Sequence, residues 1–254
     1  LVQTASMYVA GQLVKEAGIG TNIEGIPEGS DFYKPLIVAG RWLLPGDGRF
    51  GSGPAKVRDD AVAALAEAAH GYLGTSHRQP GVKSVVHRVR EGVAALLSLP
   101  DGYEVLLGNG GSTTFWDAAS FGLVDRRAQH LVCGEFSSKF AAATKAAPHL
   151  QDPEVIESAP GTHPDPHSNF EVDAYCWPHN ETSTGVMLPV QRPEGATGDQ
   201  LVLVDGTSGA GGLRVDVSQT DVYYFAPQKS FSSDGGLWLA CVSPAAIARI
   251  ERIS

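Results

Sequence analysis

The chain has 254 residues, 43% of them hydrophobic, and a formal net charge of −9. This length allows one large domain with a substantial core, and the acidic balance excludes the basic footprint of a nucleic-acid-binding protein. No apolar run approaches the roughly 20 residues of a membrane span, and the three scattered cysteines (Cys133, Cys176 and Cys241) form no disulfide framework or metal pattern, which predicts a cytoplasmic protein.

Two regions differ along the chain. Residues 1–45 contain a predicted helix over 4–18 and are expected to be an N-terminal extension, whose role stays open. Residues 46–254 are more regular, and apolar spacing predicts two helices at their start, over 57–72 and 82–97. Strands and helices then alternate, with strands over 104–107, 130–133, 172–177, 201–204, 221–225 and 237–242, and helices over 114–123 and 137–147. The Pro/His-rich stretch 151–170 predicts a surface loop.

This alternation predicts an α/β fold with a mostly parallel sheet sandwiched by helices, in which ligands gather at the carboxyl ends of strands. Asp205 ends the strand 201–204, and Lys229 follows the aromatic run 223–227. An amine and a carboxylate at such strand ends are the groups that a pyridoxal phosphate site needs. The lysine forms a Schiff base, and the carboxylate keeps the pyridine nitrogen protonated. Plainer interpretations are a lysine that reaches solvent and an aspartate in a turn.

The loop 108–113, Gly-Asn-Gly-Gly-Ser-Thr, lies between a predicted strand and a predicted helix. Its glycines allow close approach of a phosphate, and the helix N terminus presents N–H groups and a positive dipole end. Ser112 and Thr113 add hydroxyl donors. The loop matches neither the dinucleotide fingerprint nor the P-loop, so NAD and ATP are poor candidates. A tight turn with a capping hydroxyl explains the same residues equally well.

Three other groups are weaker candidates. The run 179–185, His-Asn-Glu-Thr-Ser-Thr-Gly, could fix a ring hydroxyl or a phosphate, or could be an ordinary polar loop. Phe136 could stack on a flat cofactor ring or pack in the core. His77 and Arg78 could bind an anionic substrate or lie in a solvated loop. The His/Pro run 163–167 lacks proper ligand spacing, so no metal site is expected.

Together these motifs resemble the phosphoserine aminotransferases of the actinobacterial type, which are class V enzymes of pyridoxal-phosphate fold type I. The resemblance runs from about Asp47 to the end of the chain. Single runs are weak, but six in the same order are specific. They are Asp-Gly-Arg-Phe-Gly-Ser-Gly-Pro (47–54), Gly-Thr-Ser-His-Arg-Gln (74–79), Leu-Pro-Asp-Gly-Tyr-Glu-Val (99–105), Gly-Asn-Gly-Gly-Ser-Thr (108–113), His-Asn-Glu-Thr-Ser-Thr-Gly (179–185) and Phe-Ala-Pro-Gln-Lys-Ser-Phe (225–231).

The resemblance implies a role for each matching residue. Lys229 would hold pyridoxal 5′-phosphate and shuttle the proton, and Asp205 would pair with the pyridine nitrogen. Phe136 would stack on the ring, and Thr182 would contact the ring hydroxyl. The residues implied around the cofactor phosphate are Gly111, Ser112, Thr207 and Gln228. The residues implied for the phosphate or carboxylate of the substrate are His77 and Arg78.

The implied reaction transfers an amino group from glutamate to 3-phosphohydroxypyruvate and yields 2-oxoglutarate and O-phosphoserine. It belongs to serine biosynthesis, with a link to pyridoxine biosynthesis, and the family prior is a homodimer. In the family a small C-terminal domain follows and supplies the arginine that clamps the substrate carboxylate. The match therefore covers the large domain only, and weak turnover is expected. Two alternatives stay open: a non-catalytic remnant that acts as a subunit or interaction module, and a class V aminotransferase with another small substrate.

Overall fold

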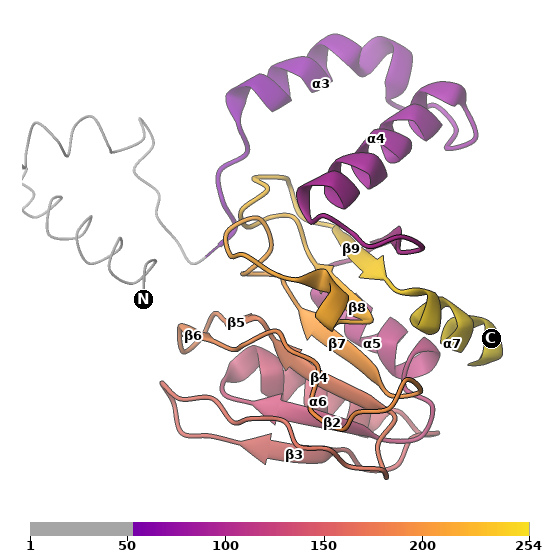
Figure 1. Cartoon of the computed structure of the whole chain (residues 1–254). Helices are drawn as coiled ribbons and strands as arrows, with labels where there is room; N and C mark the ends of the chain where they lie inside the picture. Colours follow the sequence, from indigo (N-terminus) through magenta and orange to yellow (C-terminus); the bar gives the residue numbers. More distant parts are fainter. Residues whose placement is uncertain (1–52, 254) are drawn as a thin grey trace, which may run out of the picture. The chain divides into compact units, whose positions relative to one another are not determined.

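The computed structural model describes residues 53–253, and the extension predicted for residues 1–45 lies outside this range. Within it, seven strands form one sheet in the order β1-β9-β8-β7-β4-β2-β3 (Figure 1). The strands are β1 (Glu104–Asn109), β2 (Ala128–Val132), β3 (Glu154–Glu157), β4 (Ala174–Pro178), β7 (Leu201–Asp205), β8 (Val222–Phe225) and β9 (Leu237–Val242). Neighbouring strands from β3 to β8 pair in parallel, and β9 runs antiparallel to both β8 and β1. The mostly parallel sheet predicted from the sequence is confirmed.

Three helices cover one face of the sheet: α5 (Ser112–Gly122), α6 (Glu135–Ala146) and α7 (Pro244–Ile253) (Figure 1). Because successive residues of a strand point to opposite faces, Leu203 of β7 packs on this helical side while Val202 and Val204 face the other side. Both faces of β7 are therefore buried, which is why continuous apolar runs predict the strands of this sheet.

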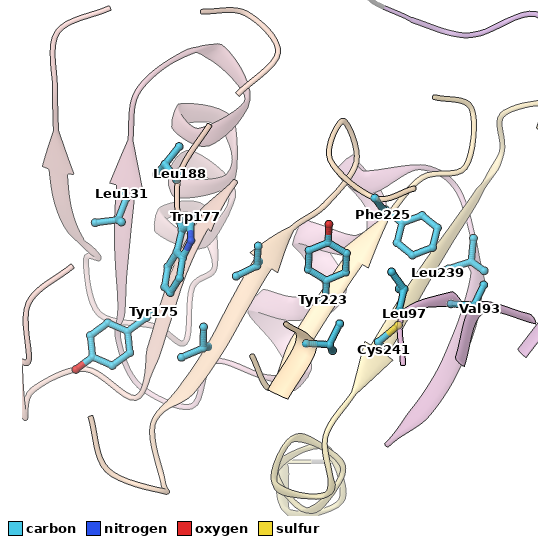
Figure 2. Close-up of a cluster of buried hydrophobic side chains, with 14 of the residues drawn as sticks. Val93, Leu97, Leu131, Tyr175, Trp177, Leu188, Tyr223, Phe225, Leu239 and Cys241 are labelled. Atoms are coloured by element: carbon cyan, nitrogen blue, oxygen red, sulfur yellow. The ribbon is translucent and has the colours of Figure 1, made fainter. Parts of the chain in front are cut away.

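The opposite face carries large aromatic side chains and is covered mainly by loops. Figure 2 shows Trp177 of β4 and Tyr223 of β8 on this face, with Leu188 from a loop near Trp177. Val93, near the end of helix α4 (Pro80–Leu96), belongs to the same cluster. Helices thus contribute to the cover of both faces, but unequally, and the loops between β6 and β8 supply most of the second cover.

The two predicted N-terminal helices form, as α3 (Asp59–Tyr72) and α4. Several of the apolar side chains on both helices are exposed to solvent. No residue of α3 is buried. On α4 the predicted apolar side includes Val86, Val89 and Leu96, which are 40%, 36% and 58% exposed. Val93 and Leu97, on the same predicted side, are buried, so the apolar spacing predicts the helix correctly but predicts burial only near its C-terminal end.

The sequence does not predict five elements. Strand β3 lies inside the stretch 151–170, which was expected to be a loop; four residues with a glutamate at each end give little apolar signal. The hairpin of β5 (Asn180–Glu181) and β6 (Val186–Met187), the short helix η1 (Val217–Gln219) and helix α7 are also new. None of the described helices is long and apolar enough to cross a membrane.

Candidate active site

A cavity of about 500 Å³ opens where β4, β7 and β8 end and where α5 and α6 begin. We call it the strand-end cavity. It lies at the carboxyl ends of parallel strands, where ligands bind in sheets of this kind. Eight residues predicted to contact a cofactor all line it: Gly111, Ser112, Phe136, Thr182, Asp205, Thr207, Gln228 and Lys229.

Lys229 reaches the strand-end cavity from the turn after β8. Parallel pairing places Asp205 of β7 beside Tyr224 of β8, so the chain arrives at Lys229 close to the end of β7. Burial lowers the pKa of Lys229, and the negative charge of Asp205 opposes this more weakly. Gly53 lies beside the Lys229 side chain with φ of +133°, a backbone conformation that favours glycine where the chain passes this amine.

Asp205 lines the strand-end cavity next to a group of aromatic side chains, Trp116, Tyr224 and Phe115. Its Oδ1 accepts a hydrogen bond from the Thr207 N–H at 2.8 Å. Trp116 of α5 donates through Nε1 to the Tyr224 hydroxyl at 2.9 Å, and Phe115 stacks on Tyr224 with ring centroids 4.1 Å apart. Burial raises the pKa of Asp205, against the lowering effect of hydrogen bonds from Thr207, Tyr224 and Trp116. A cationic ligand next to Asp205 would stabilise its ionised form, which burial disfavours.

The start of α5 forms one end of the strand-end cavity. Gly110 has φ of +96°, and a Cβ there would collide with Thr114, so the turn requires glycine. Helix α5 begins at Ser112 without a side-chain cap on its N terminus. The Ser112 hydroxyl is hydrogen-bonded to the hydroxyl of Thr207. Two hydroxyls and a helix N terminus together suit a phosphate group.

A polar cluster lies on the β5–β6 side of the strand-end cavity. Ser208 Oγ accepts hydrogen bonds from Thr182 Oγ1 at 2.8 Å and from Asn180 Nδ2 at 2.9 Å, and it donates to the Asn180 carbonyl at 2.8 Å. All three residues line the cavity. The sequence predicts Thr182 but not Ser208 or Asn180. Their signal was available, since Ser208 lies in the turn that follows Asp205 and Asn180 adjoins the strand 172–177.

No family model matches the sequence. A phosphoserine aminotransferase of Nocardioides sp. is 60% identical over 215 residues, which cover 84% of this chain and 58% of that protein. A phosphoserine aminotransferase of Corynebacterium glutamicum is 57% identical over 212 residues, 84% of this chain and 56% of that protein. The crystal structure of a phosphoserine aminotransferase from Cytophaga hutchinsonii superposes with a TM-score of 0.72 at 25% identity, covering 80% of this chain and 57% of that one.

The chain is a homologue of the phosphoserine aminotransferases. It spans 56–60% of the length of the curated relatives it matches. The fold matches the large domain of these aminotransferases, which confirms the predicted fold class.

Phe136 occupies the wall of the strand-end cavity in this aminotransferase fold. It lies in the first turn of α6 and is 41% exposed, so the alternative of a core phenylalanine is wrong. Lys139 Nζ lies 6.0 Å from the centre of its ring. An exposed ring beside a cavity is available to pack on a flat ligand.

Gln228 precedes Lys229 and contributes a buried polar atom without a partner. Its side-chain Oε1 is inaccessible to solvent and makes no hydrogen bond among the described residues. Its backbone carbonyl accepts from the Ala55 N–H at 2.7 Å. Buried polar atoms are normally paired, so this oxygen is an acceptor that lacks a donor among the described residues.

His77 and Arg78 do not join the strand-end cavity. Both are exposed in the turn between α3 and α4, where the Arg78 N–H donates to Ser76 Oγ at 3.2 Å. His77 instead lines a separate cavity of about 590 Å³ along α4. The role of these two residues toward a substrate stays a prediction.

Proposed function

We propose that this chain is the cofactor-binding part of a pyridoxal-phosphate-dependent aminotransferase. The reaction is the transfer of the amino group of glutamate to 3-phosphohydroxypyruvate, which yields 2-oxoglutarate and O-phosphoserine. The observation that carries the proposal is the meeting of Lys229 and Asp205 in one cavity with a helix N terminus and two hydroxyls at its other end. Homology to the phosphoserine aminotransferases supports the choice of reaction.

The residues of the strand-end cavity fit pyridoxal phosphate at each of its polar groups. Its volume of about 500 Å³ lies within the usual range of small-molecule sites. Asp205 would accept a hydrogen bond from the protonated pyridine nitrogen, and Thr182 would contact the ring hydroxyl. The phosphate would lie against Ser112, Thr207 and the start of α5. The chemistry of the donors is the structural observation that tests the fit: two hydroxyls and a helix N terminus without a side-chain cap lie at one end of the cavity, where they suit a phosphate.

When bound, pyridoxal phosphate supplies an aldehyde that reacts with amines and a ring that accepts an electron pair from the adjoining carbon. The chain supplies the rest. Lys229 Nζ holds the cofactor and carries a proton at the reacting carbon, and its lowered pKa increases the share of neutral amine near neutral pH. Ionised Asp205 keeps the opposite end of the ring positively charged. Phe136 packs on the ring and excludes water from one side.

Other parts of the proposal rest on homology alone. The substrates, the homodimer, the link to pyridoxine synthesis and the cytoplasmic location are predictions that follow from the resemblance to whole enzymes. His77 and Arg78 are proposed to hold an anionic group of the substrate. Turnover of glutamate with 3-phosphohydroxypyruvate, against glutamate with an unphosphorylated keto acid, would test whether the substrate is phosphorylated.

The test of cofactor binding uses the full chain with added pyridoxal phosphate. We expect a visible absorption band and, after borohydride treatment, a permanent cofactor mass on the peptide that contains Lys229. Lys229→Ala should lose both signals. Lys145→Ala is the matched control, because Lys145 is an exposed lysine on α6 that pairs with Asp152 at 3.7 Å and does not line the cavity. A wild-type chain without the band, or a label that survives Lys229→Ala, would overturn the proposal.

A further inference from the structure

Glu181 carries a charge in a completely buried position. It is 0% exposed, on the hairpin strand β5 next to Thr182. Burial raises the pKa of its carboxyl group, but hydrogen bonds from Ser137 and Ser183 outweigh this, so that the pKa lies below its ordinary value. The buried carboxylate is therefore ionised at neutral pH and is stabilised by hydrogen-bond donors.

Most of these donors belong to the first turn of α6. Glu181 Oε2 accepts hydrogen bonds from the Ser137 N–H at 2.9 Å and from Ser137 Oγ at 2.8 Å, and Oε1 accepts from the Phe136 N–H at 3.4 Å. These N–H groups lack partners inside the helix and form the positive end of its dipole. Glu181 thus acts as the cap of α6, although it lies 44 residues after Ser137 in the sequence.

Ser183 extends the same connection. Its hydroxyl donates to Glu181 Oε1 at 2.7 Å and accepts from the Glu135 N–H at 2.9 Å. A Cβ at Gly134 would lie 2.6 Å from Glu181 Cγ, closer than real Cβ atoms approach, so a glycine before α6 is needed for Glu181 to fit. The hairpin and the start of α6 are therefore joined through one carboxylate.

Both elements that Glu181 joins border the strand-end cavity. Phe136 lines it from α6, and Thr182 lines it from the hairpin. We propose that Glu181 is a positioning residue for the cofactor: it fixes the start of α6 to the β5–β6 hairpin and so sets the distance between the Phe136 ring and the Thr182 hydroxyl. The inference rests on the proposed function, in which these two residues contact pyridoxal phosphate.

The test compares Glu181→Gln with Glu154→Gln in the full chain. Glu154 is a matched control, since its pKa is also lowered and its Oε2 accepts hydrogen bonds from Gln129 and Asn169, both at 2.8 Å, but neither of these partners lines the cavity. Both variants should lower Tm. The dissociation constant of pyridoxal phosphate, measured by the visible band well below both Tm values, should rise about tenfold in Glu181→Gln and less than about twofold in Glu154→Gln.

A double-mutant cycle separates positioning from plain stability. If Glu181 acts through the Phe136 ring, Glu181→Gln should weaken cofactor binding much less in a Phe136→Ala background than in the wild type. Should Glu181→Gln fail to fold, Ser183→Ala replaces it, with an expected rise of about threefold in the dissociation constant.

The outcomes are distinguishable. Equal affinity losses in Glu181→Gln and Glu154→Gln, or losses of Glu181→Gln and Phe136→Ala that simply add, would overturn the positioning role while leaving the proposed function intact. A wild-type chain that does not bind pyridoxal phosphate would overturn the proposed function and the inference with it.

Discussion

The charged groups at the two ends of the sheet differ in how their charges are stabilised. At the amino end of β4, Asp173 accepts backbone hydrogen bonds from Asp125, Arg126 and Arg127 at 2.8–3.0 Å and lies 3.4 Å from the buried Arg249. Asp173 and Arg249 are thus paired and hydrogen-bonded, and they connect β4 to the loop before β2 and to α7.

At the carboxyl ends the balance is different. Burial pushes the pKa of Asp205 up and the pKa of Lys229 down, so each group is biased toward its neutral form. Perturbed pKa values of this kind cluster at functional sites. The amino ends of these strands therefore serve stability, while the carboxyl ends hold two groups whose pKa values burial shifts toward the neutral form.

The largest expected effect tests the stabilising end. Asp221 precedes β8 and accepts hydrogen bonds from Arg192, from the Val202 N–H at 2.8 Å and from Ser243 Oγ at 2.9 Å. Asp221→Ala should lower the free energy of unfolding by about 3 kcal/mol, because a guanidinium and a buried N–H lose their acceptor. Urea unfolding measures this loss. The control Asp152→Ala, at an exposed pair, should cost less than about 0.5 kcal/mol, and a similarly small effect for Asp221→Ala would contradict the comparison.

A smaller effect of opposite sign is expected at the carboxyl end. Asp205→Asn keeps the shape of the side chain and removes a poorly solvated charge. Without added pyridoxal phosphate it should stabilise the chain by about 1 kcal/mol at neutral pH, as expected where function opposes stability. The same change should abolish tight cofactor binding. A destabilised Asp205→Asn chain would show that this end is also built for stability.

The pH dependence of this gain has a definite sign. Since the pKa of Asp205 is raised in the folded state above its ordinary value of 3.8, the folded chain binds this proton more tightly than the unfolded chain. Its contribution to stability is lost as pH rises through the raised pKa. The stability difference between Asp205→Asn and the wild type should therefore grow as pH rises from about 4 and then level off. A difference that shrinks with rising pH would refute the assignment.

The sequence predicts the buried strands of the sheet but not its edge strand β3. The strands with buried faces, such as 201–204, are continuous apolar runs, and pattern alone finds them. Strand β3 at the sheet edge is short and half polar, and it lies in a proline-rich stretch, so its apolar pattern is too weak to predict a strand. The antiparallel pairing of β9 also could not be read from the sequence, because it depends on contacts between distant segments.

In the candidate site, the residues at the strand ends could be predicted from the sequence. The residues that hold them in place, such as Trp116 and Glu181, could not. Lys229 and Asp205 follow recognisable apolar strands, and the glycine-rich loop marks the start of α5. Trp116 reads as an ordinary helical core residue, and only the fold places it beside Tyr224. Glu181 looked like part of a polar loop, because a buried carboxylate without a nearby cation has no sequence pattern. Its partners come from α6, which only tertiary structure brings to it.

The smallest effects compare two serines that share a backbone conformation at opposite ends of the sheet. Ser98 has φ of +50° and Ser232 has φ of +52°. Ser98 ends α4, where the Leu99 N–H donates to the Ala94 carbonyl at 3.0 Å, and Ser232 closes the turn of Lys229 through its N–H to the Lys229 carbonyl, also at 3.0 Å. Because glycine adopts this conformation without strain, Ser98→Gly and Ser232→Gly should each stabilise the chain by about 0.5–1 kcal/mol.

Cofactor affinity should separate the two serine variants. Ser98→Gly should leave the dissociation constant of pyridoxal phosphate unchanged, because Ser98 lies before β1, whereas Gly111 of the strand-end cavity follows the other end of this strand, and Ser98 does not line the cavity. Ser232→Gly should raise it about twofold to threefold, because a freer turn no longer holds Lys229 in one place. Thermal melts and cofactor titrations of both variants measure the two quantities together. Equal cofactor affinities of the two variants would mean that the turn conformation at Ser232, like that at Ser98, serves only to end an element. The difference between the two ends of the sheet would then be limited to side chains and would not include the backbone.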